Sequence, residues 1–193
     1  MTLQRAKTAS DAITIMDALV QEHGYASDGE SFSIADQRDV WLMELIGKGP
    51  YEKGAVWVAS RVPEGYITAT ANQARTRTFR QDDPANVRFS PDVVTFAQKH
   101  GLYPKSSSAA DFSFSDIYDP VSFVSARICE ARVWSVFSAA LSTRTNPQPM
   151  AMHLDYAQGY NLTNRMPLFV RPAAKLAVND TMELMRTHFE NTW

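Results

Sequence analysis

The sequence has little cysteine, no nucleotide-binding glycine motif and no clustered histidines. Its single cysteine, Cys129, excludes an internal disulfide and any zinc site built from several thiolates. The eight glycines never form a GxGxxG or Walker pattern, so nothing supports nucleotide binding. The four histidines lie far apart, without the HxxxH or HExxH spacing of metal sites. We therefore expect no cofactor and no metal.

An excess of one charge and a long apolar run are also missing. Lys and Arg number 19 and Asp and Glu number 21, which gives a formal net charge of -2 with both signs interspersed. Without a basic face the chain has nothing to attract phosphate backbones, so we expect no nucleic-acid partner. No apolar run approaches the ~18 to 20 residues that span a bilayer, so we expect a soluble chain without a membrane partner. A cytoplasmic location is slightly favoured.

The densest β signal lies between Ser31 and Arg80. Four segments there alternate polar and apolar residues or are rich in branched and aromatic side chains: 31–35, 40–46, 55–62 and 66–71. Turn formers separate the first two segments, and Pro63-Glu64-Gly65 separates the last two, so we predict two successive hairpins. The last predicted strand runs directly into Asn72-Gln73-Ala74-Arg75, and residues 76–89 are read as a polar connection.

Helical periodicity, caps and stop signals predict four helices. They cover residues 9–23, a segment that starts at Ser90-Pro91-Asp92, with Ser90 as the cap, and ends at Gly101, residues 122–141 and residues 180–189. Residues 111–118 form either a short strand or an extended loop, and residues 167–172 read as a strand bounded by prolines. Because the strands cluster rather than alternate with helices, we predict an α+β fold with a largely antiparallel sheet. At 193 residues we expect one domain.

Two polar positions stand out from spacing alone. Asn72 follows an apolar strand, and its amide can donate to a developing oxyanion or hold a substrate amide. Arg132 lies in an otherwise apolar helix face and can orient a nucleophile or a carboxylate. The alternatives are a strand-end Asn that closes a turn and an Arg whose stem covers the core. Cys129 is mid-helix, where a thiol gains neither access nor a lowered pKa, so we interpret it as structural.

Several segments resemble a known family. These are QRAKTASDAI, the block from GESFSIAD to PEGYI, ANQARTRTF, DDPANVRFSPDVVTFAQKHGLY and EARVW. They look like the PepD-like cysteine dipeptidases, a family of N-terminal-nucleophile (Ntn) hydrolases. The resemblance implies an αββα sandwich of two antiparallel sheets between helical layers. It also implies dipeptide hydrolysis without a metal: the thiolate of an N-terminal Cys attacks the scissile carbonyl, and the α-amino group of that Cys serves as the base.

The resemblance also implies roles for four residues. In the related bile-salt hydrolases and penicillin acylases, an Asn at a strand end and a later Arg surround the nucleophile. Asn72 and Arg132 resemble these two and are our catalytic candidates. Gln73 and Arg75 belong to the same motif and are our substrate-binding candidates, with Arg75 as a contact for the dipeptide carboxylate.

One departure from the family concerns length. Relatives are longer, and their nucleophilic Cys lies upstream of anything that matches Met1; Cys129 does not match it. We therefore expect an internal fragment of an incomplete sandwich, inactive alone and prone to form homo-oligomers. Two alternatives to a dipeptidase remain: an amidase of the bile-salt or penicillin acylase type, and a catalytically silent binding or scaffold protein.

Overall fold

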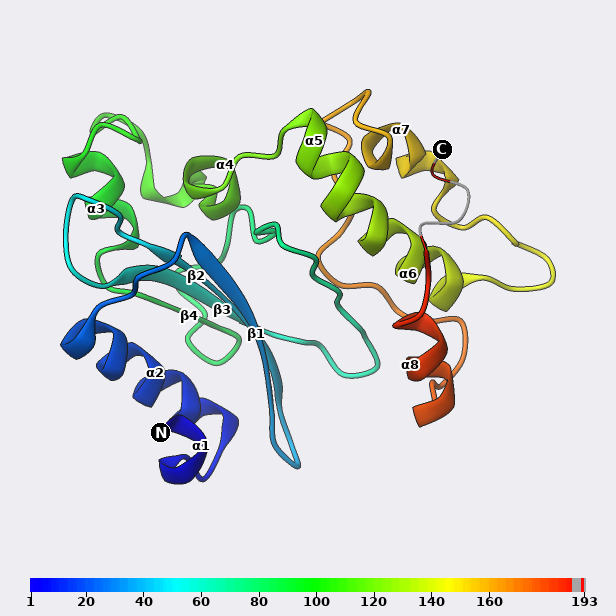
Figure 1. The fold of residues 1–193 in the computed structure, drawn as a ribbon, viewed down its shortest axis with the longest axis horizontal. Helices are drawn as coiled ribbons and strands as arrows, with labels where there is room; N and C mark the ends of the chain where they lie inside the picture. Colours follow the sequence, from blue (N-terminus) through cyan, green and yellow to red (C-terminus); the bar gives the residue numbers. More distant parts are fainter. Residues whose placement is uncertain (189–191, 193) are drawn as a thin grey trace. The chain divides into compact units, whose positions relative to one another are not determined.

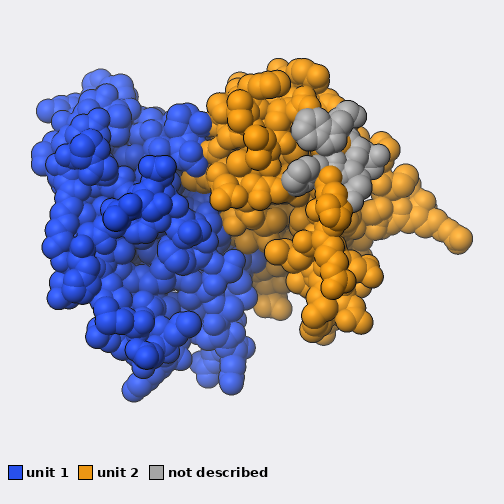
Figure 2. Space-filling view, viewed as in Figure 1, with its two compact units in different colours: residues 1–62, 76–120 blue, residues 63–75, 121–193 orange. Residues whose placement is uncertain are grey.

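The computed structural model of the chain describes residues 1–188 and 192. Residues 1–62 and 76–120 form one compact unit, called unit 1 here, and residues 63–75 and 121–193 form unit 2 (Figure 2). Each unit is therefore assembled from two separate segments of the chain. The prediction of one domain over residues 1–193 stays a prediction.

Unit 1 is built on a four-stranded antiparallel sheet. Its strands lie in the order β1 (Gly29–Ala35), β2 (Val40–Gly47), β3 (Ala55–Arg61) and β4 (Val87–Phe89). The first predicted hairpin is confirmed, with Ala35 opposite Val40 at its closed end. Asp36 fixes this turn, because its Oδ1 accepts hydrogen bonds from the backbone N–H groups of Arg38 and Asp39 at 2.7 and 2.9 Å.

The second predicted hairpin is wrong. Strand β3 pairs with β4, where Val58 faces Phe89, and not with residues 66–71. The turn at Pro63 forms, since Tyr66 N donates to Pro63 O at 3.0 Å, but the chain then enters unit 2, where only Ile67 makes a β bridge, to Val170. Strand β4 has three residues within a polar stretch, so its pairing depends on a distant partner and not on local pattern.

Helix α2 (Ala9–His23) confirms the amphipathic helix that the sequence predicts, and it covers one face of the sheet (Figure 1). The Thr8 side chain caps it by accepting from Asp11 N at 3.0 Å. Ala9 and Ile13 pack there on the sheet residues Trp41, Met43, Leu45 and Trp57. The other helices of unit 1 are the short α1 (Thr2–Arg5), α3 (Val93–Lys99) and α4 (Phe114–Tyr118), with a 3-10 turn at Ala109–Asp111.

Helix α3 lies within its predicted segment, but α4 corrects the prediction of a strand or an extended loop over residues 111–118. Aromatic residues at every second position, Phe112 and Phe114, indicate the two-residue repeat of an extended strand. In the structure, Phe114 and Tyr118 lie one helical turn apart with ring centroids 5.3 Å from each other, and both pack in a cluster with Phe112. Ser113 Oγ donates to Asp116 Oδ2 at 2.6 Å across the first turn. Burial of the aromatic rings on one helical side therefore outweighs the alternating pattern.

The regular structure in the described residues of unit 2 is helical, apart from the bridge of Ile67 to Val170. A continuous helical run comprises α5 (Phe123–Ser125), a π-helical turn (Ala126–Glu130) and α6 (Ala131–Leu141), which confirms the long helix predicted over 122–141. Two more helices follow: α7 (Leu154–Ala157), preceded by a 3-10 turn at Ala151–His153, and α8 (Val178–Leu184). The core of unit 2 gathers Trp134, Phe137, Met150, Tyr156, Met166 and Val170.

Two predictions for unit 2 need correction. Residues 167–172 form no strand beyond the single bridge of Val170 to Ile67, because the flanking prolines remove ladder donors. The last helix begins at Val178 and ends at Leu184, earlier than the predicted 180–189, and Phe189 falls outside the described residues. The α+β class is confirmed, and within the described part of the chain no helix is long and apolar enough to cross a membrane.

Candidate active-site turn

The segment Asn72–Arg75 forms a turn in unit 2, called the NQAR turn here. Asn72 has φ of 58° and is the one described non-glycine residue in the left-handed region. Asn tolerates this conformation better than most residues, yet such a backbone persists only where its surroundings enforce it. Asn72 is exposed, whereas Gln73, Ala74 and Arg75 behind it are buried. The Asn72 side chain therefore points toward solvent, while the three residues that follow it anchor the turn in the interior of unit 2.

The structure brings Asn72 and Arg132 together. Arg132 Nη2 donates to Asn72 Oδ1 and to the backbone carbonyl of Ala71, both at 2.9 Å. Its Nε donates at 2.8 Å to the carbonyl of Ile128, in the π-helical turn that precedes α6. One guanidinium thus joins the helical run to the backbone and the side chain at the start of the turn.

The contact with Arg132 also fixes which way the Asn72 amide points. A guanidinium has only donors, so the amide atom that faces it must be the oxygen. The Nδ2 group, which carries the two donor hydrogens, is then directed away from Arg132. A donor held in one orientation on an exposed turn can give a hydrogen bond to an anionic oxygen.

Arg75 points to the opposite side, into the core of unit 2. Its Nε donates to Glu130 Oε2 at 3.3 Å, and its Nη1 and Nη2 donate to the carbonyls of Ala69 and Pro167, each at 3.0 Å. The guanidinium lies over the Phe137 ring, 5.2 Å from the centroid. All three of its nitrogens therefore bind protein acceptors, and a substrate carboxylate would have to displace one of these bonds.

Sequence reasoning missed Glu130 and Tyr156. The Glu130 side chain is 1% exposed, and its Oε2 also accepts from Tyr156 OH at 3.0 Å. Burial, followed by the negative charge of Glu130, raises the pKa of Tyr156 well above its ordinary value, so the phenol stays a donor. The signal available in the sequence was a charged residue among apolar neighbours in EARVW, two positions before Arg132.

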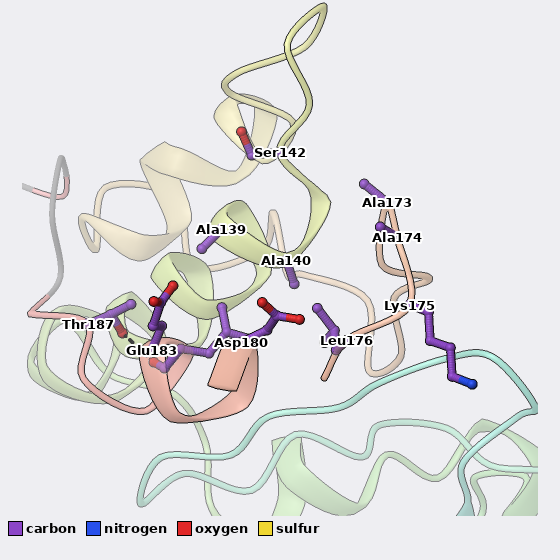
Figure 3. A pocket seen from close by; sticks show the side chains of 11 residues that line it. Ala139, Ala140, Ser142, Ala173, Ala174, Lys175, Leu176, Asp180, Glu183 and Thr187 are labelled. Carbon is purple, nitrogen blue, oxygen red and sulfur yellow. Dashed lines mark hydrogen bonds between the residues drawn. The ribbon is translucent and has the colours of Figure 1, made fainter. Parts of the chain in front are cut away.

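Unit 2 also contains the thiol of Cys129 and a cavity. Cys129 is buried in the π-helical turn. Among the described residues, no three His, Cys, Asp or Glu side chains gather as metal ligands would. A cavity of about 380 Å³ in unit 2 lies between the end of α6, residues 173–176 and α8, and none of the four predicted site residues lines it (Figure 3). Figure 3 shows its acidic side chains, Asp180 and Glu183, on α8.

Comparison with known proteins now adds the family. A sequence model of peptidase family C69 matches residues 1–193. The chain belongs to peptidase family C69. The resemblance expected from the SFSIAD and NQAR segments is therefore confirmed.

Curated members of similar sequence are named as dipeptidases. A probable dipeptidase of Salmonella dublin is 27% identical over 187 residues, which cover 97% of this chain and 38% of that protein. A probable dipeptidase of Latilactobacillus sakei is 22% identical over 192 residues, covering 100% of this chain and 36% of the relative. Dipeptidase A of Lactobacillus helveticus is 25% identical over 137 residues, 70% of this chain and 27% of the relative. The C69 chain thus spans less than two fifths of the length of these relatives.

Proposed function

We propose that this C69 chain contributes the Asn72–Arg132 pair to the active site of a dipeptidase. The family and the names of its relatives support peptide hydrolysis, and the 2.9 Å contact between Arg132 Nη2 and Asn72 Oδ1 supports the site. A dipeptide is the proposed substrate. The finer fold assignment, an αββα sandwich of the Ntn type, is part of this proposal; the antiparallel sheet of unit 1 supports it.

In the proposed mechanism, a thiolate attacks the scissile carbonyl of the dipeptide, and negative charge develops on the carbonyl oxygen. Asn72 Nδ2 donates to that oxygen and stabilises the tetrahedral intermediate. Arg132 holds the amide in the donating orientation, and its positive charge helps to orient the nucleophile. The resemblance assigns the attacking thiolate to an N-terminal Cys, and Cys129 is not proposed for this role because it is buried in the π-helical turn.

Gln73 and Arg75 were predicted to bind the substrate directly. Both are buried, and the Arg75 donors already bind Glu130, Ala69 and Pro167. We propose instead that these two residues support the NQAR turn from behind. The carboxylate of the dipeptide would then bind elsewhere in the active site.

The role of Asn72 is tested by Asn72→Ala in an active dipeptidase that contains this chain. Loss of one oxyanion donor costs about 3 to 4 kcal/mol in the transition state, so kcat should fall about 10²- to 10³-fold without loss of folding. Steady-state kinetics with dipeptides and far-UV circular dichroism measure both quantities. Asn146→Ala, in an exposed loop of unit 2, is the matched control and should leave kcat unchanged. Unchanged turnover in Asn72→Ala would refute the assignment.

The amidase alternative uses the same pair, since the Asn and Arg of bile-salt hydrolases and penicillin acylases are the residues that Asn72 and Arg132 resemble. Assaying the active protein on dipeptides and on bile-salt and penicillin amides separates the two functions. We expect turnover of dipeptides alone.

A further inference from the structure

We infer that Glu130 is a positioning residue: through Arg75 it holds the NQAR turn in the conformation that presents Asn72. The inference rests on the proposed function of Asn72 and adds to it the residue on which that function depends. Glu130 itself is buried and reaches the turn only through Arg75.

The Arg75 side chain closes a small loop around Asn72. Its Nη1 reaches back to the carbonyl of Ala69, so residues 69–75 form a ring with Asn72 at the middle of the intervening backbone. Its Nη2 ties the same ring to the carbonyl of Pro167. Two neighbouring contacts join the same two segments: Ile67 forms a β bridge with Val170, and Thr68 Oγ1 donates to Leu168 O at 2.8 Å. The shape of the loop therefore depends on where the Arg75 guanidinium lies.

Glu130 sets the place of that guanidinium. Among the Glu130, Ala69 and Pro167 acceptors, Glu130 alone carries a charge, so its contact with Arg75 adds the attraction of opposite charges, which burial leaves largely unscreened. Tyr156 OH donates to the same oxygen, Oε2, and so holds the carboxylate from the other side. The face of Phe137 limits the remaining freedom of the guanidinium.

The π-helical turn brings both anchors of the NQAR turn to one place. Glu130 is its last residue and binds Arg75, at the end of the turn. Arg132 follows two residues later and binds Ala71 and Asn72, at the start. Asn72 is thus held from both sides, which accounts for a left-handed backbone at a residue other than glycine. Single π turns inside α-helices occur often at functional sites.

The other oxygen of Glu130 argues against a purely stabilising role. Oε1 is buried and has no hydrogen-bond partner among the described residues. Burial of a carboxylate is costly, and an ion pair compensates fully only when its remaining lone pairs are satisfied. Replacement of a buried ion pair by apolar residues of similar size is often neutral or stabilising. We therefore assign to the pair the conformation that it imposes on the loop, and not a gain in stability.

The test compares Glu130→Met, Glu130→Gln and the double variant Arg75→Met/Glu130→Met. NMR follows the Asn72 side-chain amide signals, assigned by their loss in Asn72→Asp, and the Arg132 Nε–H signal. Gln keeps an acceptor for Arg75 and Tyr156, so it should preserve most of these signals. Met removes the acceptor, so the signals should shift or broaden. The double variant should unfold near the wild-type temperature and still show displaced signals, because it removes both charges together.

Asp82→Asn is the matched control, because it neutralises the exposed ion pair of Asp82 with Arg80 in unit 1 and should leave the Asn72 signals in place. Asn72 and Arg132 signals that stay at wild-type positions in folded Glu130→Met or in the double variant would overturn the inference. A lower unfolding temperature with unmoved signals would do the same, since a merely structural role predicts that result.

Kinetics separate this inference from the proposed function. In an active dipeptidase, the double variant should lower kcat by about 10²-fold, the loss typical of a misplaced catalytic group, with KM close to wild type. The NMR result needs no activity. If the signals move while Asn72→Ala keeps full turnover, the proposed function fails and the positioning role of Glu130 stands.

Discussion

At the scale of single residues, the Arg75–Glu130 pair is a deeply buried charge interaction of unit 2. The two side chains are 2% and 1% exposed, so water hardly screens them. Removal of one partner leaves the other charge buried without compensation, which is far more costly than the loss of a surface ion pair.

This difference gives a stability prediction. Glu130→Ala should lower the free energy of unfolding by about 3 to 5 kcal/mol, because buried Arg75 loses the charged acceptor that Glu130 provides. Urea denaturation followed by circular dichroism measures the change. Asp82→Ala, which breaks the exposed Arg80 pair, should change it by about 1 kcal/mol or less. Equal effects of the two substitutions would contradict the picture of a buried, tightly held pair.

At the scale of elements, the loop after β2 is joined to α3 by a network of charges. Glu52 accepts from Lys99, and its Oε1 lies 3.1 Å from His100 Nε2. Lys48 is buried between the two acidic side chains, 3.6 Å from Glu52 and 2.5 Å from Asp92. Hydrogen bonds from Lys99 and His100, with the added charge of Lys48, lower the pKa of Glu52 from 4.5 to about 2.

The shifted pKa predicts an acid-sensitive contribution to stability. Because the folded-state pKa lies below the ordinary value, ionised Glu52 stabilises the fold above about pH 4.5, and this contribution is lost as the pH falls from 4.5 to about 2. In Glu52→Gln, the midpoint temperature of thermal unfolding should therefore change less with pH across this range than in the wild type. Glu64→Gln, in the exposed turn that follows Pro63, should keep the wild-type slope. A wild-type slope in Glu52→Gln would show that the network does not act through this carboxylate.

At the scale of the whole molecule, α8 and the residue that follows it expose an apolar stripe to solvent. Val178, Met182 and Met185 are spaced four and three apart and are 71%, 51% and 80% exposed. Exposed apolar stripes of this kind bind hydrophobic dyes or associate with other molecules.

We predict that the 193-residue chain binds a hydrophobic dye or self-associates, in line with the expected homo-oligomer. Val178→Ser/Met182→Gln/Met185→Gln should reduce both dye fluorescence and the apparent mass by sedimentation. Met152→Gln, at a single residue that is 73% exposed, should change neither. A dye-silent wild-type monomer would count against the prediction.

The chain connectivity gives a second prediction at this scale. Each unit takes residues from two segments, so neither folds from one continuous stretch. We expect one cooperative thermal transition, with calorimetric and van't Hoff enthalpies in agreement, as for a single domain. Two resolved transitions would instead show that the units unfold independently.

Local signals were sufficient for the elements that depend on neighbouring residues. The cap at Thr8 and the apolar stripe of residues 9–23 predict α2. The turn formers that begin at Asp36 predict the β1–β2 hairpin, and the apolar spacing of residues 122–141 predicts the long helix. Local signals failed where distant partners decide. Strand β4 depends on β3, and the aromatic cluster around Phe112 turns an alternating pattern into helix α4.

For the candidate site, the sequence determined that Asn72 and Arg132 are candidates, because an amide after an apolar segment and a charge within an apolar helix face can be recognised from residue order alone. Only the tertiary structure decided that they are in contact, that Arg75 points into the core and that Glu130 holds it. Such contacts join residues 55 to 61 positions apart, and no local pattern encodes them. The packing of unit 2 determines which residues meet, and for Arg75 and Glu130 the physical reason is that a buried charge is stable only beside an opposite charge.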